Sequence, residues 1–333
     1  FMVIHPWAWG ILALVAIGLV VIDFLGHARN PHPPTAVEAA RWTLFYVGLA
    51  GLFGVGIWLT NGGLYAQEFY AGWAMEWSLS VDNLFVFILI LKAFRVPREN
   101  QQKALLLGIV IALLLRLVFI LLGAALVSRF SWVFFIFGLW LLWTAFSQVR
   151  ETARGSDEDE EYHESGFIRA VRRVLPITDG FIGNRMLFRH GGRTYITPML
   201  VVVLALGSAD LMFAFDSIPA IFGITQQAFL VFACNVFALM GLRQLFFLVD
   251  ALLSKLVYLG YGLGVILSFI GVKLILEALH ANTLPFINGG SGVEWAPEIS
   301  VSVSLGVIVV TLAVTVVASL IRSAMDEGDA HGN

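Results

Sequence analysis

Residues 70–91 read Tyr70-Ala-Gly-Trp-Ala-Met-Glu76-Trp-Ser-Leu-Ser-Val-Asp82-Asn83-Leu-Phe-Val-Phe-Ile-Leu-Ile-Leu91. An α-helix needs about 20 mainly apolar residues to cross the hydrocarbon core of a bilayer. This stretch has that length, and its only charged side chains are Glu76 and Asp82. We therefore interpret it as a membrane-spanning helix that carries two acids inside the membrane.

The rest of the chain has the same character. Only 13% of its 333 residues are charged, against about a quarter in soluble domains, and the mean hydropathy is +0.86. Nine apolar stretches predict an all-α polytopic membrane protein that contacts the lipid bilayer. They are residues 7–25, 42–60, 70–91, 104–127, 132–149, 196–222, 228–249, 256–279 and 301–321. No basic patch with interleaved aromatic residues indicates nucleic acid, and the single cysteine excludes an internal disulfide.

The distribution of Lys and Arg predicts the orientation, because such residues concentrate on the cytoplasmic side. With the N-terminus outside and the C-terminus inside, sixteen of the twenty basic residues fall on inner segments. Arg129 alone falls outside, and Arg116, Arg243 and Lys273 lie within spans. We therefore expect a multi-pass protein of the bacterial cytoplasmic membrane with this orientation.

The spans predict six regions. They are two N-terminal helices (1–60), a first three-helix unit (68–150), a cytoplasmic loop (151–194), a second three-helix unit (195–280), an outer loop (281–298), and a last helix with a cytoplasmic tail (299–333). In the cytoplasmic loop, an acidic run at 157–161 precedes a basic amphipathic segment at 167–175. Residues 186–189 and 194–196 then predict a small β-hairpin.

Four intramembrane acids form two matching pairs. Glu76 and Asp82 are six residues apart in the third span, as are Asp210 and Asp216 in the sixth. The similarity continues, since residues 108–116 repeat the spacing of 235–243, and 137–140 align with 270–273. Two related units of three spans each must be inserted with opposite orientations. The sequence thus predicts an inverted repeat (spans 3–5 and 6–8), as in secondary transporters with a site near the midplane.

The six-residue separation has a mechanical consequence. Six steps of a continuous α-helix rotate by about 600°, which leaves the two acids about 120° apart. Both acids of a pair can face one ligand only if the helix is interrupted between them. Pro219, Gly207 and Ser208 flank the second pair, so we expect such an interruption in the sixth span.

The residue types around the acids predict a hard divalent cation as ligand. The side chains of Ser80, Asn83 and Ser217 add oxygens to the four carboxylates, and no cluster of Cys or His accompanies them. Oxygen ligands suit Mn²⁺, Mg²⁺ or Ca²⁺ better than Zn²⁺ or Cu⁺. The three intramembrane bases, Arg116, Arg243 and Lys273, are expected to pair with the acids when the carrier is empty.

Three motifs resemble the TerC family of bacterial membrane proteins, within the lysine exporter superfamily. They are Glu76-Trp-Ser-Leu-Ser-Val-Asp82-Asn83-Leu-Phe-Val-Phe87, Asp210-Leu-Met-Phe-Ala-Phe-Asp216-Ser217-Ile-Pro-Ala220 and Asn235-Val-Phe-Ala-Leu-Met-Gly241-Leu-Arg243. The resemblance implies two inverted three-helix repeats and manganese export, in a family named for tellurium resistance. By position it implies a metal site at Glu76, Asp82, Asn83, Asp210 and Asp216. It gives a supporting role to Arg116, Arg243 and Lys273, and we add Ser80, Ser217 and Asn235.

From these observations we expect a transporter that exports Mn²⁺ by alternating access, with proton coupling left open, and no enzyme or cofactor. A Ca²⁺ or Mg²⁺ transporter with the same fold is an alternative. Another is a membrane scaffold in tellurite or envelope-stress resistance, whose charges only lock helices together. Such a scaffold would show no ion flux. A homo-oligomer or a membrane partner is left open.

Overall fold

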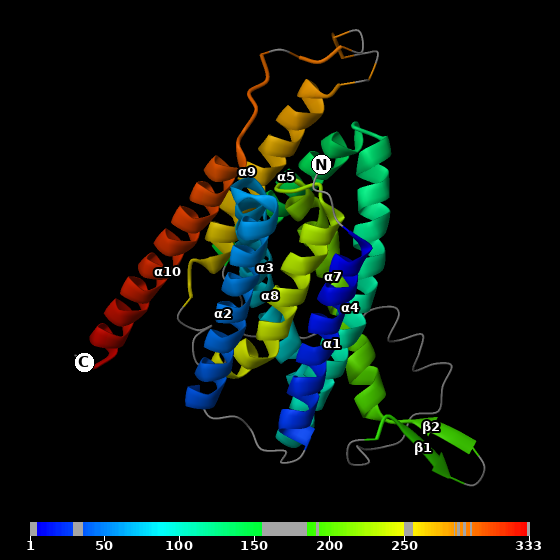
Figure 1. Cartoon of the computed structure of the whole chain (residues 1–333). Coiled ribbons are helices and arrows are strands. Elements are labelled where there is room, and N and C mark those ends of the chain that lie inside the picture. The colour runs from blue at the N-terminus through cyan, green and yellow to red at the C-terminus, as the bar shows by residue number, and fades with distance from the viewer. Residues whose placement is uncertain are drawn as a thin grey trace.

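The computed structural model describes residues 5–28, 36–154, 185–190, 193–249, 256–282, 284, 287–288, 291–293 and 295–331 (Figure 1). These residues form nine long helices and one β-hairpin. In chain order the elements are α1 (Pro6–Ala28), α2 (Ala36–Asn61), α3 (Gly63–Ala93), α4 (Arg98–Arg129), α5 (Val133–Arg154), β1 (Leu187–His190), β2 (Arg193–Ile196), α7 (Pro198–Phe222), α8 (Ala228–Val249), α9 (Leu259–His280) and α10 (Val301–His331).

The nine helices lie at the positions of the nine predicted spans. Six of them, α2, α4, α5, α7, α9 and α10, are long and apolar enough to cross a membrane over their described residues. The all-α class is thus confirmed, while the count of nine spans remains a prediction. Large apolar side chains such as Leu14, Leu59, Leu122, Phe146 and Val310 are exposed on the outside of the bundle. Such extended apolar surface requires lipid or protein around it.

Local sequence explains several helix ends. Gly62 separates α2 from α3 and has φ +96°, a conformation that glycine adopts without steric cost. Pro97 lies directly before α4, and Pro198 is the first residue of α7. Proline suits the start of a helix because its missing N–H would have no partner in the first turn. As a result, α3 and α4 begin seven and six residues before the predicted spans, and α7 begins two residues after its predicted start.

The helices do not pack in chain order. The main contacts form between the two three-helix units: α3 packs against α8, α4 against α7 and α5 against α9, whereas the consecutive helices α4 and α5 barely touch. Helix α2 covers α3 and α8, and α10 covers α3 and α9. The centre of the bundle is therefore formed by α3, α4, α7 and α8, which bear the predicted acids and their counter charges.

The predicted hairpin is present beneath the bundle. Strands β1 and β2 pair antiparallel with Leu187 opposite Ile196 and His190 opposite Arg193. In Figure 1 the hairpin lies at one end of the bundle, and the C-terminal end of α9 lies at the other. The acidic run at 157–161 and the basic segment at 167–175 lie outside the described residues.

Candidate functional site

An arginine lies at the centre of the bundle. Arg116 projects from α4 and is 1% exposed. Its Nε donates a hydrogen bond to Asp210 Oδ2 on α7 at 2.8 Å, and its Nη2 donates to Asp210 Oδ1 at 3.1 Å. This two-point contact is the geometry in which a guanidinium and a carboxylate match best. The pair joins α4 to α7.

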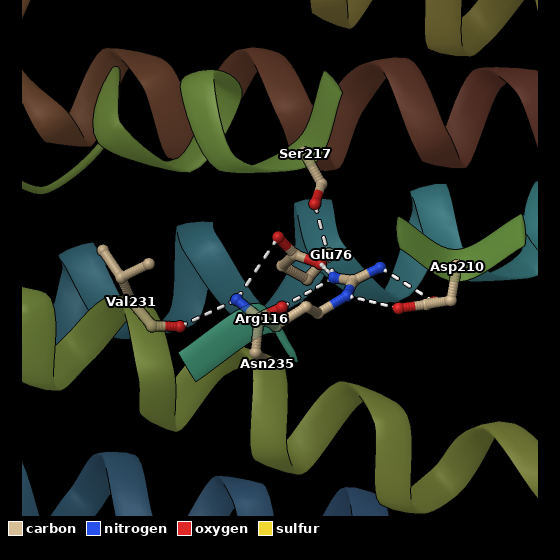
Figure 2. Close-up of polar contacts among 6 residues, drawn as sticks. All are labelled: Glu76, Arg116, Asp210, Ser217, Val231 and Asn235. Carbon is tan, nitrogen blue, oxygen red and sulfur yellow. Dashed lines mark hydrogen bonds and ion pairs between the residues drawn. The ribbon is translucent and has the colours of Figure 1, made fainter. Parts of the chain in front are cut away.

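The Nη1 atom of the same guanidinium contacts side chains from both three-helix units. Arg116 Nη1 lies 2.8 Å from Glu76 Oε2 on α3, 2.6 Å from Asn235 Oδ1 on α8, and 3.3 Å from Ser217 Oγ on α7. The Asn235 side chain donates through Nδ2 to Glu76 Oε1 at 3.4 Å and to the Val231 carbonyl oxygen at 2.9 Å. Figure 2 shows these side chains converging from four helices.

We call Glu76, Arg116, Asp210, Ser217 and Asn235 the central cluster. Glu76 and Asp210 are each 1% exposed, so together with Arg116 three ionisable groups lie away from solvent. Buried charges are tolerated only when they are paired and hydrogen-bonded. When both carboxyl groups are ionised, one guanidinium between them leaves a net charge of −1. The cluster is thus one positive charge short of neutrality.

Asp216 lies elsewhere, which corrects our expectation that both acids of the pair face one ligand. Helix α7 runs from Pro198 to Phe222 without the predicted interruption, although Pro219 lies inside it. The rotation of a continuous helix therefore turns Asp216 away from Asp210. Its Oδ1 accepts hydrogen bonds from Trp140 Nε1 at 2.7 Å and from Thr144 Oγ1 at 3.1 Å, both on α5.

The remaining candidates are placed as follows. Ser80 and Asn83 are buried on α3, and Ser80 Oγ has no hydrogen-bond partner among the described residues. Lys273 is on α9 and donates to Ser304 Oγ of α10 at 3.2 Å, so it does not belong to the central cluster. The backbones of Asp82 and Arg243 lie in α3 and α8, but their side chains lie outside the described part of the structure.

In this arrangement, the described residues contain no group of three or more His, Cys, Asp or Glu side chains gathered around a metal position. The central cluster does hold two carboxylates, a hydroxyl and an amide oxygen around one positive charge. The four side-chain types are ligands that hard divalent cations accept. The guanidinium occupies the space between them.

Several polar residues around this centre were not predicted. Trp140 and Thr144 are the partners of Asp216, and Glu68 and Glu277 line a pocket near one end of the bundle. Glu277 lies within the predicted eighth span, and its charge was a readable signal there. Glu68 lies just before the third span. Acidic residues are common at the membrane surface, so its position in the sequence gives no signal of a site.

The fold and the central cluster define a polytopic helical membrane protein with a buried ionic centre. The model of the family described as integral membrane protein TerC family matches residues 61–327. The chain belongs to this family, as the three sequence motifs indicated.

Relatives extend this membership to distant organisms. An uncharacterized membrane protein of Mycobacterium tuberculosis is 46% identical over 93% of this chain and 78% of its own length. The thylakoid membrane protein TERC of Arabidopsis thaliana is 37% identical over 84% of this chain and 68% of its own length. A protein of Photorhabdus laumondii named Alx, described as a candidate membrane-bound redox modulator, is 35% identical over 83% and 88%. No solved structure matches the chain.

Proposed function

We propose that this chain is a secondary transporter that exports a divalent cation, Mn²⁺, from the cytoplasm by alternating access. The observation that carries the proposal is the position of Arg116 between Glu76 and Asp210. These two acids occupy equivalent positions in the two repeat units. A cation site formed by matching residues from two inverted units is expected of such transporters.

Helix packing supports an inverted repeat. Exchange of the two units would exchange α3 with α7, α4 with α8 and α5 with α9. The contact of α3 with α8 would then become the contact of α7 with α4, and both contacts are present. The pair α5 and α9 would map onto itself, and these helices also pack together.

The guanidinium of Arg116 would act as a tethered substitute for the transported ion. In the described state it neutralises one of the two carboxylate charges. When Mn²⁺ enters, Arg116 would withdraw and the ion would bind Glu76, Asp210 and the neighbouring oxygens of Ser217 and Asn235. A carrier that fills its own site can reorient empty without exposing two unpaired carboxylates.

A transport assay tests the proposal. Inside-out vesicles that contain a Mn²⁺-sensitive dye are expected to accumulate Mn²⁺ with the intact protein, and to lose most of this uptake with Glu76→Gln or Asp210→Asn. Glu151→Gln, an exposed acid at the end of α5, is the matched control and should transport normally. Undiminished uptake with both cluster variants, in amounts of protein equal to the intact chain, would overturn the assignment.

The scaffold remains the second candidate, and one observation favours it. The nitrogen donors of Arg116 already have acceptors within the bundle, as expected of a purely structural lock. A scaffold predicts no flux with the intact protein in the same vesicles. It also predicts no stabilisation by Mn²⁺.

Thiol redox chemistry receives no support from the residues, despite the description of Alx. Cys234 is the single cysteine of the 333 residues, and it is fully buried on α8 with its Sγ donating to the Phe69 carbonyl oxygen. A dithiol couple needs two cysteines. We therefore place the function in the ionic centre.

A further inference from the structure

A second charged site lies at the end of the bundle that the charge distribution predicts to face outward. A pocket of about 490 Å³ opens between the start of α3, the turn from α7 to α8, the end of α9 and the residues before α10. We call it the outer pocket. Its charged lining consists of Glu68, Lys273, Glu277, His280 and Glu298.

Two of these carboxylates are held in place by neutral donors. Thr225 Oγ1 donates to Glu68 Oε2 at 2.5 Å, and Gln226 Nε2 donates to Glu277 Oε1 at 2.8 Å. Both donors belong to the short turn between α7 and α8. Each carboxylate keeps a second oxygen for which no protein donor is found among the described residues. The turn thus positions both acids without neutralising either.

Lys273 provides a second observation, because among the described residues it does not neutralise the two acids through a direct ion pair and so leaves them available to a ligand. It lines the outer pocket and is only 6% exposed. Of its three N–H donors, one binds Ser304 Oγ, and no ion pair of Lys273 is found in the described part of the chain. Glu68 and Glu277 are nevertheless close enough to act on its charge. A buried ammonium that lacks a directly bonded carboxylate is costly, and here it faces an open pocket.

The net charge of the outer pocket would be balanced by a divalent cation. His280 Nε2 lies 3.0 Å from Glu298 Oε1. With Glu68, Glu277 and Glu298 ionised (−3), Lys273 charged (+1) and His280 counted as neutral, the net charge is −2. The volume exceeds what a bare ion requires. Hydrated Mn²⁺ and Mg²⁺ fit this combination, because such small hard cations retain several water ligands and bind through one or two carboxylates.

The outer pocket is stacked above the central cluster on the same helix. Glu68 and Glu76 both belong to α3 and are eight residues apart, which corresponds to about 12 Å along the axis. Phe222 and Gly223, at the end of the helix that bears Asp210, line the pocket as well. An ion that left the central cluster in the outward direction would meet this pocket next.

We propose that the outer pocket binds a hydrated divalent cation, with Glu68 and Glu277 as its carboxylate ligands and Lys273 as a tethered charge that keeps the binding weak. The role of this pocket in releasing an exported ion rests on the proposed function. Its ability to bind a divalent cation does not depend on that function. Lys273 would then partly neutralise the carboxylates of the outer pocket, as Arg116 does for those of the central cluster.

Site-specific spin labelling tests binding without any transport. The single native cysteine, Cys234, is fully buried, so a nitroxide can be attached to Ala281→Cys, an exposed position that lines the pocket. Paramagnetic Mn²⁺ bound in the pocket should broaden the nitroxide spectrum in a saturable manner. Excess Mg²⁺, which is diamagnetic, should reverse the broadening. The labelled intact chain without the added cysteine measures any background from Cys234.

Variants in the labelled background identify the ligands. Joint replacement Glu68→Gln with Glu277→Gln should raise the half-saturating Mn²⁺ concentration by about 10–100-fold. Lys273→Met removes the opposing charge and should lower it, by about tenfold if the charge contributes about 1.4 kcal/mol. Glu151→Gln should leave it unchanged. A spectrum that never saturates, or half-saturation that the joint replacement does not move, would overturn the proposal.

The same protein in vesicles separates the two proposals. Saturable broadening at position 281 without Mn²⁺ uptake would leave the outer pocket standing and remove the transport function. Uptake that depends on Glu76 and Asp210, with no broadening at position 281, would support the transport function and remove the outer pocket as a binding site. If both hold, Lys273→Met should slow uptake, because the ion then leaves the pocket more slowly.

Discussion

Asp210 holds Arg116 through both carboxylate oxygens, with Nε–Oδ2 at 2.8 Å and Nη2–Oδ1 at 3.1 Å, although the two residues are 94 positions apart in the chain. Removal of one partner of a buried ion pair leaves an uncompensated charge and costs about 3–5 kcal/mol. We expect Arg116→Met to lower the thermal stability of the purified protein in EDTA by about this amount. Arg150→Met, an exposed site on α5, is the control.

The same variant tests whether a metal can replace the guanidinium. With Arg116 absent, Mn²⁺ should bind between Glu76 and Asp210 and restore stability. A ligand at about 100-fold above its Kd contributes about 2.7 kcal/mol. If thermal unfolding of Arg116→Met is the same in EDTA and in millimolar Mn²⁺, the central cluster has no cation site of this kind.

The oxygen chemistry of the central cluster predicts an order of ions. Carboxylate, hydroxyl and amide oxygens favour Mn²⁺, Mg²⁺ and Ca²⁺ over Zn²⁺, which prefers His and Cys. Thermal shifts of the intact protein should therefore be larger with Mn²⁺ than with Zn²⁺ at equal concentration. Glu76→Gln should reduce the Mn²⁺ shift. A Zn²⁺ shift that exceeds the others, or a Ca²⁺ shift that exceeds that of Mn²⁺, would redirect the substrate assignment.

Gly138 and Gly271 bring α5 and α9 together. A Cβ at Gly138 would lie 2.8 Å from the Gly271 carbonyl oxygen, and one at Gly271 would lie 3.0 Å from the Gly138 carbonyl oxygen. The two glycines are also matched in the sequence repeat. Overpacking costs about 1–3 kcal/mol, so Gly138→Ala should lower thermal stability by an amount in this range.

A glycine in open surroundings provides the control for this measurement. At Gly306 of α10, a Cβ would meet no heavy atom of another part of the described chain within 4 Å, and alanine is favoured over glycine inside a helix by about 1 kcal/mol. Gly306→Ala should therefore be neutral or stabilising. If Gly138→Ala and Gly306→Ala change thermal stability equally, α5 and α9 can move apart to accommodate the added methyl group without loss of stability.

The hydrogen bond from Trp140 to Asp216 anchors α5 against α7. Hydrogen bonds to charged groups contribute about 1.5–3 kcal/mol, so Trp140→Phe should destabilise the protein by up to this amount. Trp143→Phe, on the same helix at a position 67% exposed, should have little effect. In a double-mutant cycle with Asp216→Asn, a coupling near zero would indicate that the bond contributes nothing to stability.

The positions of the helices could be predicted from the chain because the bilayer leaves few choices. Backbone groups have no water to bind in the hydrocarbon core, so an apolar stretch of about 20 residues forms a helix there. Stretches such as 104–127 and 301–321 accordingly coincide with α4 and α10. The hairpin at 187–196 was also readable, because polar turn residues separate two short β-prone segments.

The membership of the central cluster was only partly readable. Glu76, Arg116, Asp210, Ser217 and Asn235 were all candidates because polar residues inside spans are rare. Sequence spacing could not say that Asp216 belongs with Trp140 and Thr144. Helical rotation separates Asp210 from Asp216, and the helix that each one faces depends on how distant segments pack.

The sequence by itself therefore determined a bundle of apolar helices with two matched acid pairs, since hydropathy and periodicity are local properties. The tertiary structure alone decided that Glu76 and Asp210 share one arginine and that Lys273 stays apart to line the outer pocket. The reason is physical: a buried charge must find a partner, and partners 40 and 94 residues away from Arg116 in the chain become neighbours only when the helices pack.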